Sequence, residues 1–355
     1  MRLSFPVALI LALLATLFVI CVRFNSGRED HQRDAELEAA SRTSAFLGDW
    51  AVASKVGAGV PGSLPSRIRR IRDGAEMALI PRGIFMMGSV VGDRDANDDE
   101  QPRHEVRLTE DYYLDVNEVT NQQFEAFVKA TGYRTTAEES GSGLALRSDG
   151  VGWDLRRGAY WRNSFSAEER RSDWHRLPVI LVSFNDAIAF ARWVGASLPS
   201  EAQFERAIRC GGSGLLFPWG DASTPPQDFG NYLGSEMRLA FPRLNLNVVN
   251  GVGDDFPMLA PVQSFRPNEY GVCDLSGNVW EWCSDWYDDR YYELGMSVDP
   301  TGPAVGKTRV VRGGAWNSGM AAIRSSCRAS QLPNESCDFV GLRLAKRVEE
   351  SSKNR

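Results

Sequence analysis

The fold of this chain is decided by the stretch Gly277-Asn278-Val279-Trp280-Glu281-Trp282-Cys283-Ser284-Asp285-Trp286, followed later by Arg309-Val310-Val311-Arg312-Gly313-Gly314-Ala315-Trp316. Its three tryptophans surround one glutamate, and a carboxylate in such an apolar setting needs a charged or polar partner. The Gly-Gly pair indicates backbone that only residues without a Cβ adopt easily. A tightly turned, tryptophan-lined corner is therefore expected at this place.

Four further segments accompany this corner in sequence order. They are Asp115-Val116-Asn117-Glu118-Val119-Thr120-Asn121, Leu198-Pro199-Ser200-Glu201-Ala202-Gln203-Phe204-Glu205, Phe217-Pro218-Trp219-Gly220-Asp221 and Val340-Gly341-Leu342-Arg343. Together with the corner they resemble the formylglycine-generating enzyme (sulfatase-modifying factor) family over about 77–346. The resemblance implies an α+β fold, a variant of the C-type-lectin architecture with little regular secondary structure. One fold hosts many chemistries, so activity has to be argued from the site.

The resemblance places the catalytic metal of the family just after the Gly-Gly turn. There the family carries two cysteines, with four residues between them, that bind copper and activate oxygen. In this chain Ser318 and Ile323 occupy the two positions. Copper(I) selects soft thiolate ligands, and an isoleucine offers no ligand at all. The sequence therefore predicts loss of copper binding and no catalytic residue at these positions.

The resemblance also implies two calcium sites in the irregular half of the domain. The first is expected to use Asn231, the Tyr232 carbonyl, Asp254 and the Phe256 carbonyl, and the second Asp274, the Gly277 and Val279 carbonyls, and Glu281. Calcium takes six to eight oxygen ligands, and loops rich in exposed carbonyls suit it. The alternative is that these carboxylates cap turns or face water.

Five cysteines lie outside the N-terminal apolar run: Cys210, Cys273, Cys283, Cys327 and Cys337. They form no C-x-x-C spacing, which excludes a zinc ribbon or a thioredoxin-type motif. Animal members of the family carry a disulfide near two of these positions, and the resemblance therefore implies a bond between Cys210 and Cys327.

The N-terminus carries a candidate membrane segment. The 20-residue run 3–22 has no charged residue and is long enough to cross a bilayer. Bulky residues at its end, where a signal peptidase needs small ones, favour an uncleaved anchor over a signal sequence. The expected organisation is a signal anchor at 1–24, a stalk or linker at 25–75, the domain at 76–347 and a tail at 348–355. The bulk of the chain is then periplasmic or extracellular.

Composition excludes one class of partner. The net charge is -6 and no stripe of Lys or Arg is present, so nucleic acid is not an expected partner. The expected partners are the membrane, through the N-terminal helix, and a protein, peptide or glycan ligand.

Local signals predict the regular elements. Capping boxes at Thr120, Ser183 and Ser200 predict three helices, which are expected to stop at Gly132, Gly195 and Gly211. Two apolar runs in 77–89 predict a hairpin, and 104–108, 112–116, 308–312 and 340–344 read as strands. The charge-rich segment 136–176 is expected to be a surface insertion.

Other chemistry is not favoured by the sequence. The loop 93–100 has alternating carboxylates, but Asp98 and His104 stand where a calcium loop needs Gly and Glu, which favours a solvated loop. The three histidines are too scattered to form a metal triad. The preferred hypothesis is a membrane-anchored relative that has lost copper-dependent cysteine oxidation and acts as a binding or accessory module. The alternative is an oxidoreductase that modifies protein cysteine, or a related tailoring enzyme that uses other ligands.

Overall fold

The computed structural model describes residues 50–53, 64–147, 149–164, 172–212, 215–243, 248–249 and 253–348. The predicted membrane segment 3–22 lies outside these residues. Within the described ranges, no helix has the length and apolar character needed to span a membrane.

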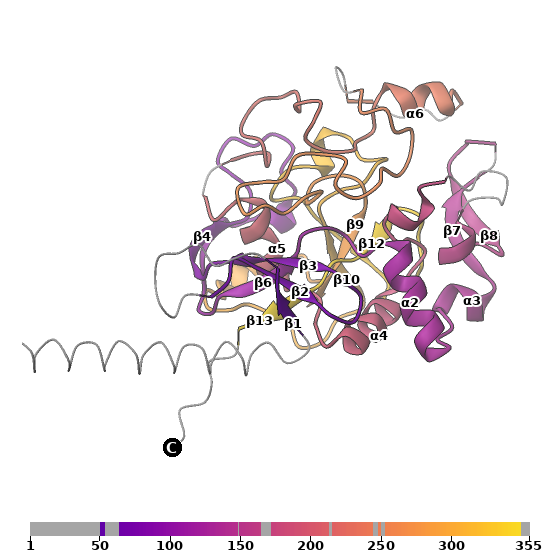
Figure 1. Cartoon of the computed structure of the whole chain (residues 1–355). Helices are drawn as coiled ribbons and strands as arrows, with labels where there is room; N and C mark the ends of the chain where they lie inside the picture. Colours follow the sequence, from indigo (N-terminus) through magenta and orange to yellow (C-terminus); the bar gives the residue numbers. More distant parts are fainter. Residues whose placement is uncertain are drawn as a thin grey trace, which may run out of the picture.

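A five-stranded antiparallel sheet joins the two ends of the domain (Figure 1). Its strands, in spatial order, are β1 Trp50–Val52, β2 Arg67–Arg70, β3 Glu76–Ile80, β6 Tyr112–Asp115 and β13 Ala345–Arg347. Strand β13 pairs with β6, so the C-terminal end of the domain closes onto its N-terminal part.

The tryptophan-rich stretch forms the centre of a second, four-stranded sheet. Its order is β11 Arg328–Gln331, β10 Arg309–Arg312, β9 Trp280–Trp286 and β12 Val340–Gly341. Strand β12 runs parallel to β9, and the other neighbours are antiparallel. Both segments that decided the fold from sequence therefore lie side by side in space.

The three helices predicted from capping boxes are confirmed. They are α2 Asn121–Thr131, α4 Phe184–Val194 and α5 Glu201–Ile208, each with the predicted capping residue in place. Gly132 and Gly195 end the first two in the left-handed conformation, whereas α5 already ends at Arg209. Helices α2 and α4 pack with Trp282 and Trp316 in the largest apolar core of the domain.

Several smaller elements lie around this core. They are α3 Thr136–Ser140, α6 Ser235–Ala240, the pair β7 Ser142–Leu146 and β8 Trp153–Arg157, the pair β4 Gly83–Met87 and β5 His104–Leu108, and short 3-10 turns at Asp98–Glu100, Trp161–Asn163, Trp174–Arg176, Tyr291–Leu294 and Met320–Ala322. Between α5 and β9, α6 is the one helix among the described residues, and the rest is loop (Figure 1). The irregular second half expected from sequence is thus present, with one short helix added.

Three organisational predictions need correction. The apolar runs in 77–89 do not form a hairpin, because β3 pairs with β2 and β6 whereas β4 pairs with β5. The segment 136–176 is not only a surface insertion, because Trp161 and Trp174 are buried in the main core. The linker predicted for 25–75 contains β1 and β2, since buried Trp50 and Ile68 attach them to the domain.

Candidate functional site

Backbone hydrogen bonds join the residues just before the Trp-rich strand β9 to the Gly-Gly turn. The Gly277 amide donates to the Gly313 carbonyl at 2.9 Å, and the Trp316 amide donates to the Asn278 carbonyl at 2.9 Å. A Cβ at Gly313 would lie 2.9 Å from the Leu275 carbonyl oxygen, and both turn glycines have positive φ. Glycine is therefore required here by close backbone approach as well as by conformation.

Ser318 and Ile323, which the resemblance aligns with the family's copper cysteines, both contact this turn. Ser318 is buried, and its Oγ accepts a hydrogen bond from the Ala315 amide at 2.9 Å. Ile323 is fully buried, and it packs with Phe217, Tyr232 and Val249. A hydroxyl that caps a turn and an apolar side chain in a core provide no soft ligand for copper(I).

The residues expected for the first calcium site lie together. Asp254 accepts hydrogen bonds from the Tyr232 amide at 3.0 Å and from the Phe256 amide at 2.9 Å. Asn231 donates from Nδ2 to the Met258 carbonyl at 2.6 Å, while its buried Oδ1 has no hydrogen-bond partner in the described structure. Burial raises the pKa of Asp254 to about 6. These segments present oxygen atoms in a buried loop, which suits calcium.

The residues expected for the second site are held differently. Glu281 accepts two hydrogen bonds from Arg343, at 2.6 Å to Nε and 2.7 Å to Nη2. Asp274 accepts from the Gln263 amide at 3.1 Å through Oδ2, and its Oδ1 is buried without a partner in the described structure. The carboxylate between two tryptophans therefore has the partner that its environment requires, and this partner is a guanidinium.

Glu118 joins this second group, although it was not predicted as a site residue. Its Oε1 accepts a hydrogen bond from Asn278 Nδ2 at 3.0 Å, and its Oε2 is buried with no partner in the described structure. Burial, and then the neighbouring charge of Asp274, raise the pKa of Glu118 well above its ordinary value. The sequence signal was its place in the motif 115–121, but only the fold brings that motif against Asp274. Among the described residues no group of three or more His, Cys, Asp or Glu side chains forms a metal cluster.

Buried arginines form a layer of ion pairs near the Gly-Gly turn. The pairs are Arg312–Glu205, Arg324–Glu100, Arg328–Glu201 and Arg209–Glu205, and all of these side chains are almost fully buried. Asp93 also pairs with Arg324, at 2.6 Å. The acidic loop 93–100 is thus partly buried by this pairing, whereas the sequence favoured a solvated loop.

All five described cysteines are free, and the Cys210–Cys327 disulfide implied by the resemblance is not formed. The two thiols have different surroundings: Cys210 accepts from the backbone of Glu269 and Tyr270, whereas Cys327 lies close to the charges of Glu100 and Arg324. Burial raises the pKa of all five thiols. They are consequently protonated at neutral pH and are poor nucleophiles.

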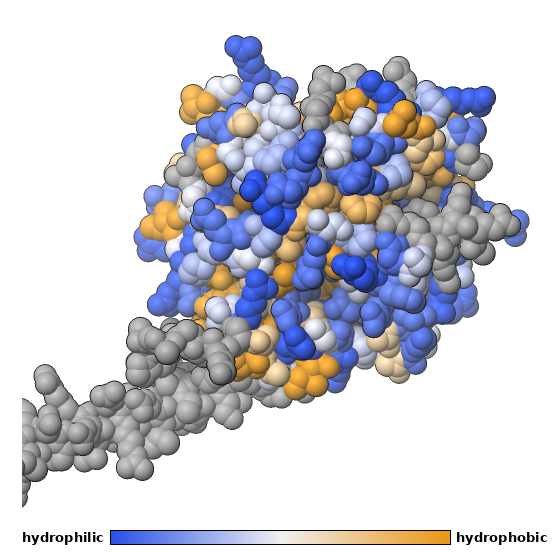
Figure 2. Space-filling view, turned by 45° about the horizontal axis from the view of Figure 1, so that its top comes forward, coloured by the Kyte–Doolittle hydropathy of each residue, from blue (hydrophilic) through white to orange (hydrophobic). Residues whose placement is uncertain are grey.

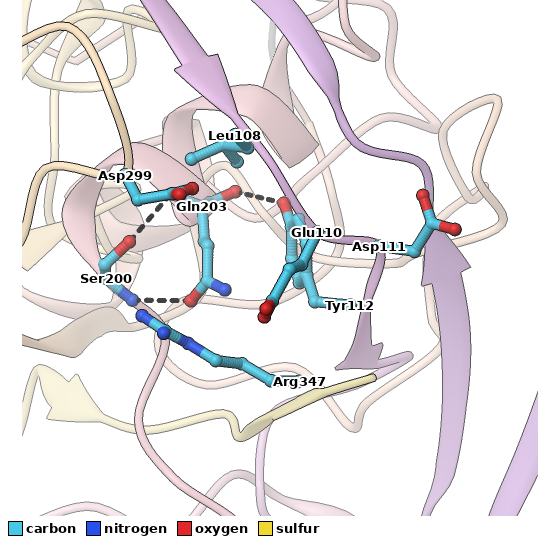
Figure 3. A pocket seen from close by; sticks show the side chains of 8 residues that line it. All are labelled: Leu108, Glu110, Asp111, Tyr112, Ser200, Gln203, Asp299 and Arg347. Atoms are coloured by element: carbon cyan, nitrogen blue, oxygen red, sulfur yellow. Dashed lines mark hydrogen bonds between the residues drawn. The ribbon is translucent and has the colours of Figure 1, made fainter. Parts of the chain in front are cut away.

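A small pocket lies where α5 begins (Figure 3). Ser200 and Gln203 form the capping box of this helix, and the Tyr112 hydroxyl donates to the Gln203 carbonyl at 2.6 Å. The cavity holds about 20 Å³, which is room for one water molecule. The side chains of Tyr112, Ser200 and Gln203 already bond to backbone atoms at the start of α5, so the pocket is a structural feature of the helix start.

On the face drawn in Figure 2, hydrophilic residues are interspersed with apolar ones. Large exposed apolar side chains such as Val91, Leu239 and Val305 come from distant parts of the chain. Single exposed apolar residues of this kind are normal for soluble domains and mark no binding surface by themselves.

The match to known proteins agrees with this geometry. The sulfatase-modifying factor enzyme 1-like domain matches residues 64–348. The chain belongs to this family. It is 38% identical over 298 residues to the formylglycine-generating enzyme of Streptomyces coelicolor, covering 79% of this chain and 92% of that protein. It is also 31% identical over 290 residues to the inactive C-alpha-formylglycine-generating enzyme 2 of Mus musculus, covering 76% of this chain and 85% of that protein.

Among solved structures the fold is similar to that of PvdO from Pseudomonas aeruginosa. The TM-score is 0.62 at 24% identity, over 82% of this chain and all of that one. The α+β family fold predicted from the Trp-rich corner is confirmed by these matches. The match to the family domain begins at residue 64, so it includes β2, whereas β1 Trp50–Val52 lies before it.

Proposed function

We propose that this protein is a membrane-anchored, exported relative of the formylglycine-generating enzymes that no longer oxidises cysteine with copper and acts as a binding or accessory module. The single observation that carries this proposal is the pair Ser318 and Ile323 beside the Gly-Gly turn. One caps the turn through its hydroxyl and the other fills an apolar core. Without soft ligands this place cannot bind copper(I), which is the group that activates oxygen in the family.

Sequence similarity to a relative named inactive supports the loss of activity. The mouse inactive C-alpha-formylglycine-generating enzyme 2 shares 31% identity with this chain. The anchor in the proposal rests on the uncharged run 3–22, and the exported location follows from that run and from the family. We also propose that the domain has a C-type-lectin-like architecture. A peptide, protein or glycan is the expected ligand class, and nucleic acid is not expected because the chain carries a net charge of -6.

Calcium is part of the proposal as a structural cofactor. The buried Oδ1 atoms of Asn231 and Asp274, which have no partner in the described structure, support the two expected sites. A bound calcium would supply positive charge to these loops and would hold them in place, and the chain's own residues would contribute the side-chain and carbonyl oxygens. Its role here is to stabilise the irregular half of the domain, with no part in a reaction.

The alternative function is that of an oxidoreductase acting on protein cysteine. Its support is the 38% identity to the Streptomyces coelicolor enzyme and the retention of the interlocked turns. In that case another ligand set would have to hold the oxygen-activating metal. The free thiols do not favour this alternative function. Burial raises the pKa of Cys327 to about 11 and of Cys337 to about 12, and the deprotonated thiolate is the form that binds a metal.

One experiment separates the two functions. The purified full-length protein, in detergent, is incubated with copper, oxygen and a Cys-x-Pro-x-Arg peptide, and the peptide mass is followed over time. The Streptomyces coelicolor relative serves as the positive control. We expect no change of the peptide mass with this protein. A mass loss that matches conversion of cysteine to an aldehyde would establish the oxidoreductase instead.

A further inference from the structure

The described part of the chain enters the domain at a fixed point. Trp50 stands opposite Arg70 in the β1–β2 pair, and its side chain is buried in a small apolar cluster with Ile68 and Tyr113. Arg70 closes the turn between β2 and β3, because its amide donates to the Ala75 carbonyl at 2.8 Å. The chain that precedes Trp50 therefore joins the domain beside this turn.

The β2–β3 turn presents an apolar side chain and an arginine next to the end of helix α4. Ile71 is 63% exposed, and Arg72 is also exposed. Arg72 donates to the Trp193 carbonyl, and its Cζ lies 5.8 Å from the centroid of the half-buried Trp193 ring. The residue before this tryptophan, Arg192, is exposed. Ile71, Arg72, Arg192 and Trp193 together form the turn patch, and Figure 1 shows β1 and α4 along the same lower edge of the domain.

The two arginines of the turn patch carry positive charge that no carboxylate balances. Within the described part of the chain neither of them forms an ion pair, and the carboxylates of the turn and of the following strand are already paired, Asp73 with Arg70 and Glu76 with Arg69. The chain as a whole has a net charge of -6. An anionic surface therefore repels the molecule overall, and a positively charged patch decides which side of it can approach.

We propose that the turn patch docks the domain onto an anionic phospholipid bilayer. Arg72 and Arg192 bind lipid phosphates, Ile71 inserts between the headgroups, and the Trp193 indole lies at the interface, where tryptophan is favoured. A single exposed isoleucine would mark no site, but here it stands with two unpaired arginines and a tryptophan where the chain enters. This inference rests on the membrane anchor of the proposed function and adds a second contact, which fixes the side of the domain that faces the bilayer.

The length of the preceding chain supports a bilayer as the occupant. The uncharged run ends at residue 22, so the 27 residues 23–49 separate it from Trp50. Even when fully extended, a chain of this length spans at most about 90 Å. Such a tether gives the patch an effective concentration near the bilayer that is roughly millimolar, so weak contacts are sufficient. A soluble partner gains no such advantage, which favours the bilayer.

The test places a fluorescent label at the patch in the full-length protein. Ile71→Cys carries an apolar, environment-sensitive probe and is reconstituted in nanodiscs of phosphatidylcholine and phosphatidylglycerol that contain brominated lipid as quencher. Leu239→Cys is the matched control, because Leu239 is 81% exposed and its helix α6 lies at the other end of the molecule from β1 (Figure 1). Labelled wild type gives the background, since Cys210 is only half-buried. We expect brominated lipid to quench the label at residue 71 and not at residue 239.

Charge reversal in the labelled Ile71→Cys protein tests the arginines. Arg72→Glu with Arg192→Glu should lower the ratio of docked to undocked protein by about tenfold or more, since each arginine near an anionic surface contributes roughly a fivefold factor. Arg238→Glu with Arg243→Glu changes the charge equally at exposed positions in and just after α6 and should leave the ratio unchanged. Thermal unfolding shows whether each variant is folded. If the first reversal is not, Arg72→Gln with Arg192→Gln replaces it, with the same direction expected.

The outcomes separate this inference from the anchor. Equal quenching at residues 71 and 239 would overturn the docking surface, as would quenching at residue 71 that neither charge reversal nor omission of phosphatidylglycerol reduces. Flotation of the full-length protein with vesicles in alkaline carbonate tests the anchor separately. Protein that leaves the lipid would overturn the anchor and this inference together, whereas protein that floats without quenching at residue 71 would overturn this inference alone. Neither result bears on the peptide oxidation assay.

Discussion

Arg343 donates two hydrogen bonds to Glu281, at 2.6 and 2.7 Å, and both side chains are buried. This ion pair connects the segment after β12 to the Trp-rich strand β9. The two strands also pair in parallel, with Val340 opposite Trp280 and Gly341 opposite Glu281. Two sequence motifs that lie about sixty residues apart along the chain are thus joined by one ion pair and one strand contact.

Weakening this pair is expected to destabilise the fold. Arg343→Met removes the guanidinium and leaves Glu281 without its ion-pair partner in the core. Breaking a buried ion pair costs about 3–5 kcal/mol in the free energy of unfolding. Urea unfolding of the full-length protein, with calcium held constant, measures the change.

Arg69→Met is the matched control, because Arg69 and Glu76 form an exposed pair with side chains 54% and 36% accessible. Exposed pairs contribute about 1 kcal/mol or less. Equal effects of the two substitutions would contradict the structural importance of the Arg343–Glu281 contact.

The Gly-Gly turn should not tolerate a side chain. In Gly313→Ala the new Cβ would lie 2.9 Å from the Leu275 carbonyl at a φ of +97°. Gly132→Ala has a similar conformational cost at +69°, but open space around the Cβ. We expect Gly132→Ala to cost about 1 kcal/mol of unfolding free energy and Gly313→Ala clearly more. Denaturant unfolding of both variants measures the difference, and a cost at Gly313 no larger than at Gly132 would rule out the steric argument.

Copper binding should return when the missing thiols are restored. Ser318 and Ile323 both touch the Gly-Gly turn: Ser318 bonds to Ala315, and an added Cβ on Gly314 would meet Ile323 at 2.9 Å. We expect Ser318→Cys with Ile323→Cys to bind about one copper(I) per chain, because two thiolates form a soft site. Competition with a colorimetric copper(I) chelator measures binding, and Ser318→Cys alone is the control. Equal binding by the single and double variants would show that the two positions do not form one site.

Stability should depend on pH through Asp285. Burial, and then the charge of Glu201, raise the pKa of Asp285 to about 7, from 3.8. A carboxyl whose pKa is raised by folding favours the folded state most when it is protonated. Its contribution is therefore complete below about pH 4 and is lost as the pH rises to about 7. In Asp285→Asn this part of the pH dependence should disappear. Urea unfolding at several pH values between 4 and 8 measures it, and parallel curves for both proteins would contradict the assignment.

Local signals in the sequence were sufficient for α2, α4 and α5, but not for the short helices α3 and α6. Thr120, Ser183 and Ser200 each precede a Gln or Asp that completes a capping box, and the structure has all three. Such signals are reliable because the contacts lie within four residues. Strand pairing was less predictable: the turn at Pro81 suggested a hairpin, but β3 and β4 belong to different sheets. Pairing depends on partners far along the chain, and no local pattern specifies them.

The candidate site was predicted only in part for the same reason. The resemblance indicated Asp274 and Glu281 as site residues. It did not indicate that Arg343 donates hydrogen bonds to both carboxylate oxygens of Glu281, or that Glu118 lies close to Asp274. It also implied a Cys210–Cys327 bond that the fold does not form. These relations are decided by which distant segments meet, and a single sequence does not record them.

The sequence by itself determined the family and the starts of α2, α4 and α5, because each is carried by residue identity or short-range spacing. Only the tertiary structure decided where β1 and β2 belong, which arginine neutralises which carboxylate, and that Glu118 and Asp274 leave two buried oxygens without a donor. Burial and charge pairing are properties of three-dimensional packing, since the energy of an ionised group depends on what surrounds it and not on its neighbours in the chain.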